Sequence, residues 1–342
     1  MNKRGFASDN NSGVHPQMIE ALTKVNEGHV TGYGNDCYTQ QAIAKFEEIF
    51  GTGIDVYFVF NGTGANTLSI STLTRSFHAV IAPSTAHIIS DECGAPEKLT
   101  GSKLIPIETS NGKITPEQIK KHLHGFDFEH HSQPKLISIS QVTELGTIYT
   151  PDEIRAICDL AHQHNMFVHM DGARIANAAV SLGLSFKEFT RDSGVDVLSF
   201  GGTKNGMMMG EAVIFFNKEL SNDAKYLRKQ SAQLFSKMRY VGAQFLAYFE
   251  NDLWRTSALH ANKMAALLEE KVKELGVEVT QKVQANGVFA IIDDEIRDQL
   301  QKEYFFYPWD ENRHEVRWMT SFDTKEEDIL LFCAKLKELL NG

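Results

Sequence analysis

The chain has 342 residues, 42% of them hydrophobic and 23% charged, which is enough for one large or two medium globular domains. Its net charge of −10 and lack of any Lys/Arg run argue against a nucleic-acid or anionic-membrane partner. No apolar stretch reaches the ~18 residues of a membrane span, and the first residues form no secretory signal. The cysteines show no CxxC or zinc spacing, so we expect reduced thiols, a cytoplasmic location and no catalytic metal.

Taken in chain order, the first two thirds alternate helical and strand patterns. Short apolar runs predict buried strands at 56–60, 135–141, 166–171, 195–200 and 210–216. Apolar residues at helical spacing predict helices at 39–50, 62–73, 150–165 and 174–183. The helix after residue 150 has a capping box of Thr150 and Glu153, with Pro151 at its first position. This alternation favours an α/β protein with a mostly parallel sheet covered on both faces.

The pattern changes near residue 245. A long helical pattern ends at Gly276, two strands are predicted at 286–293 and 315–323, and a final helix at 324–340. These elements are typical of a smaller α+β domain. We therefore expect three parts: an N-terminal arm at 1–14, a large domain at 15–245 and a small C-terminal domain at 246–342.

Three motifs stand at predicted strand ends. The first is "NGTGAN", which places Gly62 and Thr63 between a strand and a helix. Backbone N–H groups at a helix N-terminus bind anions, and glycine lets a phosphate approach closely. The motif lacks the spacing of a dinucleotide fingerprint or a P-loop, so a plain tight turn is the alternative.

The second motif is "HMDGAR", in which Asp171 ends an apolar strand and Arg174 follows three residues later. Ligands of parallel sheets bind at the carboxyl edge, and a buried carboxylate there needs a cationic partner. The partner could be a protonated ring nitrogen of a cofactor. The alternatives are a structural Asp171–Arg174 pair or an N-cap for the next helix.

The third motif, "SFGGTKNG", holds Lys204 in a glycine-rich turn after a buried strand. A surface loop charge is the simplest interpretation of such a lysine. Its order after the glycine turn and Asp171 favours another. Pyridoxal 5'-phosphate requires an anion site, a pyridinium partner and a Schiff-base amine, and the three motifs would supply one each.

The chain resembles the threonine aldolase / β-eliminating lyase family of fold-type I pyridoxal-phosphate enzymes. The resemblance is carried by "SDNNSGVHP", "GYGND", "NGTGAN", "AHI", "DECGAP", "HMDGARIANAAV" and "SFGGTKNG", and it extends over nearly the whole chain. It implies an aspartate aminotransferase-like fold. "DECGAP" and "SISQVTELGTIYTPDEI" are most similar to the low-specificity threonine aldolase or phenylserine aldolase branch.

The resemblance also implies roles for single residues. Lys204 forms the Schiff base, Asp171 pairs with the pyridine nitrogen, and Gly62 and Thr63 bind the phosphate. The remaining candidates are two active-site histidines, of which His87 stacks on the cofactor ring and the second is His130 (or the adjacent His131). Gln141 would be a polar contact to the ring, and Ser8, Arg174 and Arg317 would be substrate-carboxylate ligands, with Arg174 also among the cofactor-binding residues. The segment 228–239 is longer than its usual counterpart, which leaves open whether Arg228, Lys229 or Arg239 meets the phosphate.

The expected reaction is cleavage of a β-hydroxy-α-amino acid to glycine and an aldehyde. His87, His130 or a water that they orient could accept the hydroxyl proton. β-Elimination or transamination of a small amino acid would use the same Lys204 and Asp171 and is the main alternative; a catalytically silent cofactor-binding protein is another. The resemblance further implies a homodimer or homotetramer with active sites at the interface.

Overall fold

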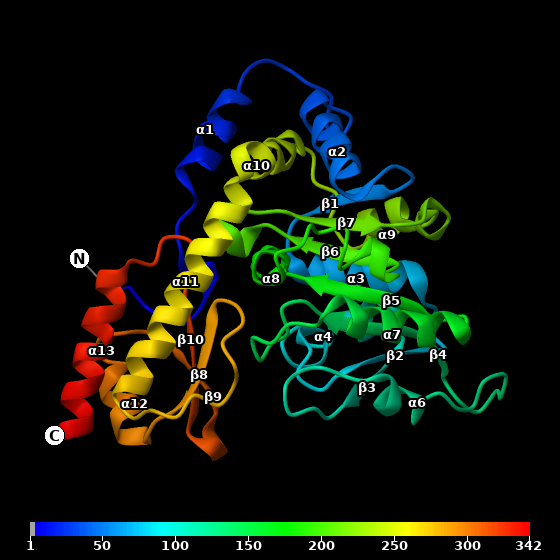
Figure 1. Cartoon of the computed structure of the whole chain (residues 1–342). Helices are drawn as coiled ribbons and strands as arrows, with labels where there is room; N and C mark the ends of the chain where they lie inside the picture. The colour runs from blue at the N-terminus through cyan, green and yellow to red at the C-terminus, as the bar shows by residue number, and fades with distance from the viewer. Residues whose placement is uncertain (1–3) are drawn as a thin grey trace.

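The computed structural model describes residues 4–342, so the first three residues of the expected N-terminal arm lie outside the described part of the chain. Two sheets organise it (Figure 1). The large sheet has the strand order β1-β7-β6-β5-β4-β2-β3. Its strands are β1 (Asp55–Val59), β2 (His78–Pro83), β3 (Lys103–Ile107), β4 (Gln133–Ser140), β5 (Phe167–Gly172), β6 (Val197–Gly201) and β7 (Glu211–Phe215).

All neighbouring strands of the large sheet are parallel except at β7, which runs antiparallel to both β1 and β6. The registers of β4, β5 and β6 align Ser140 with Asp171 and Asp171 with Ser199. Three strands with aligned carboxyl ends therefore present their following loops at one edge, where parallel sheets bind ligands.

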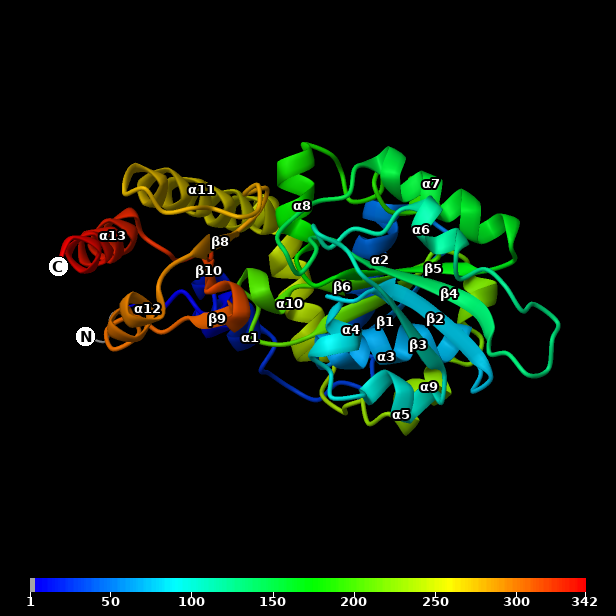
Figure 2. The ribbon, with the colours of Figure 1, turned by 90° about the horizontal axis from the view of Figure 1, so that it is seen from below.

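Helices cover both faces of this sheet (Figure 2). One face carries α3 (Gly62–Leu73), α4 (His87–Ser90), α5 (Ala95–Thr100) and α9 (Ala224–Gln230). The other carries α2 (Cys37–Phe50), α6 (Pro116–Lys120), α7 (Pro151–Gln163), α8 (Ile175–Leu182) and α10 (Arg239–Phe249), with α1 (Pro16–Lys24) packed on α10. Burial on both faces explains why the strands are nearly continuous apolar runs.

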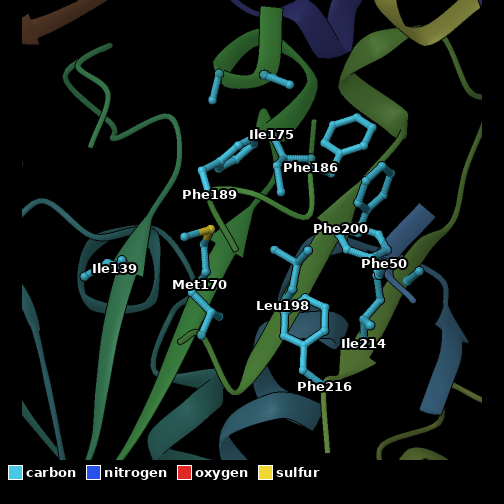
Figure 3. Packing of buried hydrophobic residues seen from close by; sticks show 14 of the residues in the cluster. Phe50, Ile139, Met170, Ile175, Phe186, Phe189, Leu198, Phe200, Ile214 and Phe216 are labelled. Atoms are coloured by element: carbon cyan, nitrogen blue, oxygen red, sulfur yellow. The ribbon is translucent and has the colours of Figure 1, made fainter. Parts of the chain in front are cut away.

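The larger core contains a group of packed aromatic rings, and Figure 3 shows Phe50, Phe186 and Phe200 among its aliphatic side chains. Phe200 of β6 packs edge-to-face against Phe50 and Phe186, with ring centroids 6.2 and 5.1 Å apart. Each of these rings is at most 3% exposed. This packing fixes the end of β6, and therefore the turn that follows it, against the neighbouring helices.

The second sheet has the order β8-β10-β9 and is antiparallel. Its strands are β8 (Gly287–Ile291), β9 (Tyr307–Asp310) and β10 (Glu315–Met319). The helices of this part of the chain are α11 (Leu253–Glu274), α12 (Asp294–Leu300) and α13 (Glu326–Asn341). A separate core forms around Trp318 and Phe332. Phe6 is buried in this core. Its N–H donates to the Phe305 carbonyl and its carbonyl accepts from the Met319 N–H, so the N-terminal segment is anchored here.

The predicted α/β fold is confirmed, as are the predicted strands of the large sheet within about two residues. The capping box is confirmed too: Thr150 Oγ1 accepts from the Glu153 N–H, and Glu153 Oε2 accepts from the Thr150 N–H. Strands β2, β3 and β9 were not predicted. Two separate cores agree with the expected large and small domains, whose boundary remains a prediction.

Candidate active site

Two connected hollows lie at the carboxyl edge of the large sheet. The inner cavity, of about 360 Å³, lies among the ends of β4, β5 and β6 and the start of α3. The outer cleft, of about 850 Å³, extends from it to β9 and β10 of the second sheet. Side chains that line both are Asn10, His87, Glu144, Arg174 and Lys204. Most residues predicted from the sequence therefore meet in one place.

Lys204 lies in a short 3-10 turn (Thr203–Asn205) directly after β6 and faces both hollows. Burial, and next the nearby charge of Arg174, lower the pKa of its amine below the usual lysine value. A smaller fraction of the amine is then protonated at neutral pH, and the unprotonated amine is the nucleophile. The interpretation of Lys204 as a surface loop charge is wrong.

Asp171, near the end of β5, is 8% exposed. Its Oδ2 accepts a 2.7 Å hydrogen bond from Asn66 Nδ2, and its Oδ1 accepts from the Ala173 N–H. Burial alone would raise the pKa of Asp171, but the Asn66 hydrogen bond and the charge of Lys204 help hold it below the usual value. The carboxylate is therefore ionised and available to a cation in the cavity.

A chain of hydrogen bonds runs from Asp171 to His87. Asn66 Nδ2 also donates to Glu92 Oε1 at 2.8 Å, and the same oxygen lies 2.9 Å from His87 Nδ1. The hydrogen bond to Glu92 raises the pKa of His87 against the opposing effect of burial. The imidazole is thus held in a fixed orientation at the cavity wall.

The first turn of α3 forms an anion cradle. Asn61 caps the helix by accepting from the Gly64 N–H at 2.8 Å, while Gly62 and Thr63 line the inner cavity. The leading N–H groups of a helix have no intrahelical partner and point towards an anion. A Cβ built on Gly62 would meet nothing within 4 Å, so there is room at this turn. The plain-turn interpretation of "NGTGAN" is incomplete.

The basic residues of 228–239 do not line this cavity. Arg228 Nη1 donates to the Phe58 carbonyl at 3.1 Å, and Arg239 Nη1 donates to the carbonyls of Glu27 and Gly28. Lys229 lies over the Tyr33 ring. Within residues 4–342, none of these three basic side chains therefore joins Gly62 and Thr63 at the inner cavity.

The two predicted carboxylate-binding arginines differ. Arg174 donates from Nε and Nη2 to the two carboxylate oxygens of buried Asp9, at 2.7 and 2.8 Å, so it pairs with Asp9 and not with Asp171. Arg317 of β10 has a long 3.4 Å contact to the Ala7 carbonyl, and its Nε has no partner among the described residues. Burial and the charge of Arg174 lower the pKa of Arg317 to about 10, but it remains cationic at neutral pH. Arg317 therefore has the freer donors.

Three further predicted residues have different outcomes. Ser8 lines the outer cleft as expected. Gln141 does not face either hollow: its side chain donates to the Tyr149 carbonyl and accepts from the Tyr149 N–H, which braces the loop after β4. His130 is 72% exposed and precedes β4, at the sheet edge opposite the cavity, and the ring of His131 lies tilted against that of Phe128. The structure brings neither Gln141 nor His130 to the site.

Sequence reasoning missed several acidic and amide side chains of the site. They are Asp9, Asn66, Glu92, Glu144 and Glu211. Three of them stand in the motifs "SDN", "NGTGAN" and "DECGAP", but the sequence did not indicate which residues they would bind. Glu144 stands in the stretch "SISQVTELGTIYTPDEI" and Glu211 follows a glycine at the start of β7, but their contacts depend on loops that meet only in the folded chain.

The strand order with a single antiparallel β7, and a half-buried lysine directly after β6, define the fold-type I class of aspartate aminotransferase-like proteins. A double mutant of aspartate aminotransferase from Thermus thermophilus superposes with a TM-score of 0.74 at 15% identity, covering 99% of this chain and 92% of that one. The family model for beta-eliminating lyases matches residues 5–295, and the chain belongs to that family.

Two relatives are more similar. A low specificity L-threonine aldolase of Pseudomonas sp. (strain NCIMB 10558) is 41% identical over 340 residues, which cover 98% of each chain. The solved threonine aldolase of Leishmania major is 32% identical, with a TM-score of 0.92, and covers 98% of this chain and 99% of that one. In the described part of this chain, no helix is long and apolar enough to cross a membrane.

Proposed function

We propose that this protein is a pyridoxal-phosphate-dependent aldolase that cleaves β-hydroxy-α-amino acids to glycine and an aldehyde. The observation that carries the proposal is the half-buried Lys204, whose amine has a lowered pKa, between the N-terminus of α3 and an ionised aspartate. The full-length similarity to proteins named low specificity L-threonine aldolase supports the same reaction class.

The residues present fit the phosphate, the ring nitrogen and the aldehyde carbon of the cofactor. The N–H groups at Gly62 and Thr63 would hold the phosphate, and Asp171 would keep the ring nitrogen protonated. Lys204 would hold the cofactor through its amine, and His87, fixed by Glu92, would pack on the ring. When bound, pyridoxal phosphate supplies an electron sink for the charge that develops at the substrate Cα.

The outer cleft would bind the substrate carboxylate. Arg317 offers a fork of donors there, and Arg174, fixed by Asp9, adds positive charge without giving up its own pair. Ser8 lies on the same cleft and would add a hydroxyl contact. This binding would orient the bond between Cα and Cβ relative to the cofactor and thereby select which bond breaks.

Assembly with a second copy would complete the site. Phe60 and Met208 line the inner cavity, yet they are 51% and 42% exposed in the single chain. Apolar side chains at the mouth of a cavity are typical of a surface that another molecule covers. We propose a homodimer or homotetramer, which sedimentation equilibrium would distinguish from a monomer. The free state of all four cysteines fits the proposed reducing, cytoplasmic location.

One assay separates the proposed reaction from its alternative. The cofactor-loaded protein is expected to release glycine and aldehyde from threonine, allo-threonine or phenylserine. Pyruvate release from serine or cysteine, without aldehyde release from any of the three, would instead establish a β-eliminating lyase. No turnover in either assay, with cofactor bound, would leave transamination or the catalytically silent alternative.

A further inference from the structure

Glu144 is a carboxyl that the proposed function leaves unused. It lies in the loop between β4 and α7, and its Oε1 accepts from Ser140 Oγ at 2.6 Å and from the His87 N–H at 3.0 Å. Its Oε2 is buried and has no hydrogen-bond partner within residues 4–342. A buried carboxyl oxygen without a partner is unfavourable, so this atom suits a donor that arrives with a ligand.

The position of Glu144 indicates which ligand group that donor belongs to. Glu144 lines both hollows, as Lys204 does, whereas Arg317 lines only the outer cleft. The amine of Lys204 marks the reacting end of the site, and Arg317 marks the carboxylate. A side chain at the junction of the two hollows faces the part of the substrate next to Cα, where the β-hydroxyl stands.

We propose that Glu144 is the general base that accepts the β-hydroxyl proton of the substrate. The O–H bond breaks and its proton goes to Glu144 Oε2, the C=O bond of the aldehyde forms, and the Cα–Cβ bond breaks. The electron pair of that bond stays with Cα, which takes a proton from water to give glycine, and Glu144 returns its proton to water and is ionised again. The inference rests on the proposed function and names a residue for a step that the function requires.

The other candidates fit this step less well. His130 is exposed at the opposite edge of the sheet. His87 Nδ1 is bound to Glu92, and its raised pKa favours a proton already in place. Glu211, whose pKa burial raises to about 7, accepts from the Gly202 N–H behind Lys204 and does not line the outer cleft.

Burial raises the pKa of Glu144, and the nearby negative charge of Asp171 adds to this. The titratable and charged groups around it come from α4, β5, the start of α8, the turn after β6 and the loop before α7: His87, Asp171, Arg174, Lys204 and Tyr149. A base must be ionised to work, so cleavage should rise with pH through the raised pKa of Glu144.

The decisive variant is Glu144→Gln, which keeps the size of the side chain and the acceptor for Ser140. We expect kcat for cleavage to fall at least ~100-fold and the acid limb of its pH profile to disappear. Exchange of the glycine α-proton with deuterium in D2O needs no hydroxyl proton transfer and should stay within about threefold of wild type. Glu48→Gln, an exposed control on α2, should change neither rate.

A second measurement uses the protein without cofactor. The infrared difference between wild type and Glu144→Gln should contain one carboxylic acid band that titrates above the ordinary glutamate pKa. Ser140→Ala, which removes a hydrogen bond to the ionised form, should shift that band to higher pH. A band that titrates at the ordinary value would overturn the inference.

The outcomes separate the inference from the function beneath it. Cleavage by Glu144→Gln within about threefold of wild type, or an equal loss of cleavage and glycine exchange, would overturn the role of Glu144 alone. Wild-type protein that exchanges glycine but releases no aldehyde would overturn the proposed function and the inference with it. Loss of cleavage with retained exchange supports both.

Discussion

The inner cavity and the outer cleft differ in how their main charged side chains are held, although both contain buried polar atoms without a hydrogen-bond partner among the described residues. In the cavity, Asp171, Asn66, Glu92 and His87 form a continuous hydrogen-bonded chain. In the cleft, Arg317 lies over the Trp309 ring and makes one long hydrogen bond, to the Ala7 carbonyl, while its buried Nε has no hydrogen-bond partner in the described residues. The side chains that would hold the cofactor are therefore fixed before it binds, whereas Arg317 in the cleft keeps N–H donors free for a substrate that binds and leaves in each turnover.

The largest effect should come from the amine that both regions share. Lys204→Ala should lower kcat for aldehyde release by about four orders of magnitude, because both the covalent attachment and its proton transfers are lost. Steady-state aldehyde release measures this, with exposed Lys263→Ala on α11 as the control. A variant that keeps a tenth of the wild-type rate would contradict the assignment of Lys204.

The next effect tests the organised cavity. Asp171→Asn keeps the shape but loses the negative charge that would hold the ring nitrogen protonated. We expect a loss of about 2–4 kcal/mol in transition-state stabilisation, or ~30- to 800-fold in kcat, comparable to other preorganised groups. Pre-steady-state rates with saturating substrate would measure it. If kcat is unchanged, the hydrogen-bonded chain serves the fold and not the reaction.

The open cleft should respond in KM. Arg317→Ala should raise KM for β-hydroxy amino acids ~30- to 150-fold, because the substrate carboxylate loses its charged partner. This change corresponds to about 2–3 kcal/mol of lost binding free energy. Cofactor binding, measured by equilibrium dialysis, should stay as in wild type, since Arg317 does not line the inner cavity. An unchanged KM would move the carboxylate site to Arg174.

A smaller effect concerns the ion pair that holds Arg174. Burial alone would raise the pKa of Asp9, but the charge and hydrogen bonds of Arg174 lower it to about 2 from 3.8. The lowered pKa of Asp9 contributes about 2 kcal/mol to the free energy of unfolding. This contribution is fully present above pH ~4 and is lost as the pH falls towards 2. Asp9→Asn should therefore lose at least about 2 kcal/mol at pH 7.

Urea unfolding of the cofactor-free protein measures that loss. Wild type should lose part of its advantage over Asp9→Asn between pH 4 and pH 3, since only wild type has the lowered carboxylate to protonate. Equal stability of the two proteins at pH 7 would show that Arg174 finds another partner.

The smallest effect is expected at His130. The side chain is 72% exposed and lines neither hollow. It lies just before β4, whereas the hollows lie at the carboxyl end of that strand. His130→Ala should leave kcat and KM within about twofold, as surface changes usually do. A loss above tenfold in the assembled protein would indicate that a neighbouring copy brings this loop to its active site.

Residues at strand ends were predictable because their local signals are strong. An apolar run followed by Asp171 or by the glycine turn of Lys204 can be recognised without knowledge of the fold, since parallel strands bring their carboxyl ends together. Gln141 shows the limit of this reasoning. It follows a strand at the right edge, yet its amide is bound to the Tyr149 backbone, a contact that no spacing predicts.

The amino-acid sequence by itself determined the alternation of strands and helices, the capping of α7, and the three motifs that place Gly62, Asp171 and Lys204 at one edge. These depend on local periodicity and on the polarity of neighbouring residues. Only the tertiary structure decided that Asp9 forms an ion pair with Arg174, that Arg317 Nε has no hydrogen-bond partner among the described residues, and that the same holds for Glu144 Oε2. Such features are set by pairing between residues far apart in the chain, because hydrogen bonds and burial are properties of the folded neighbourhood.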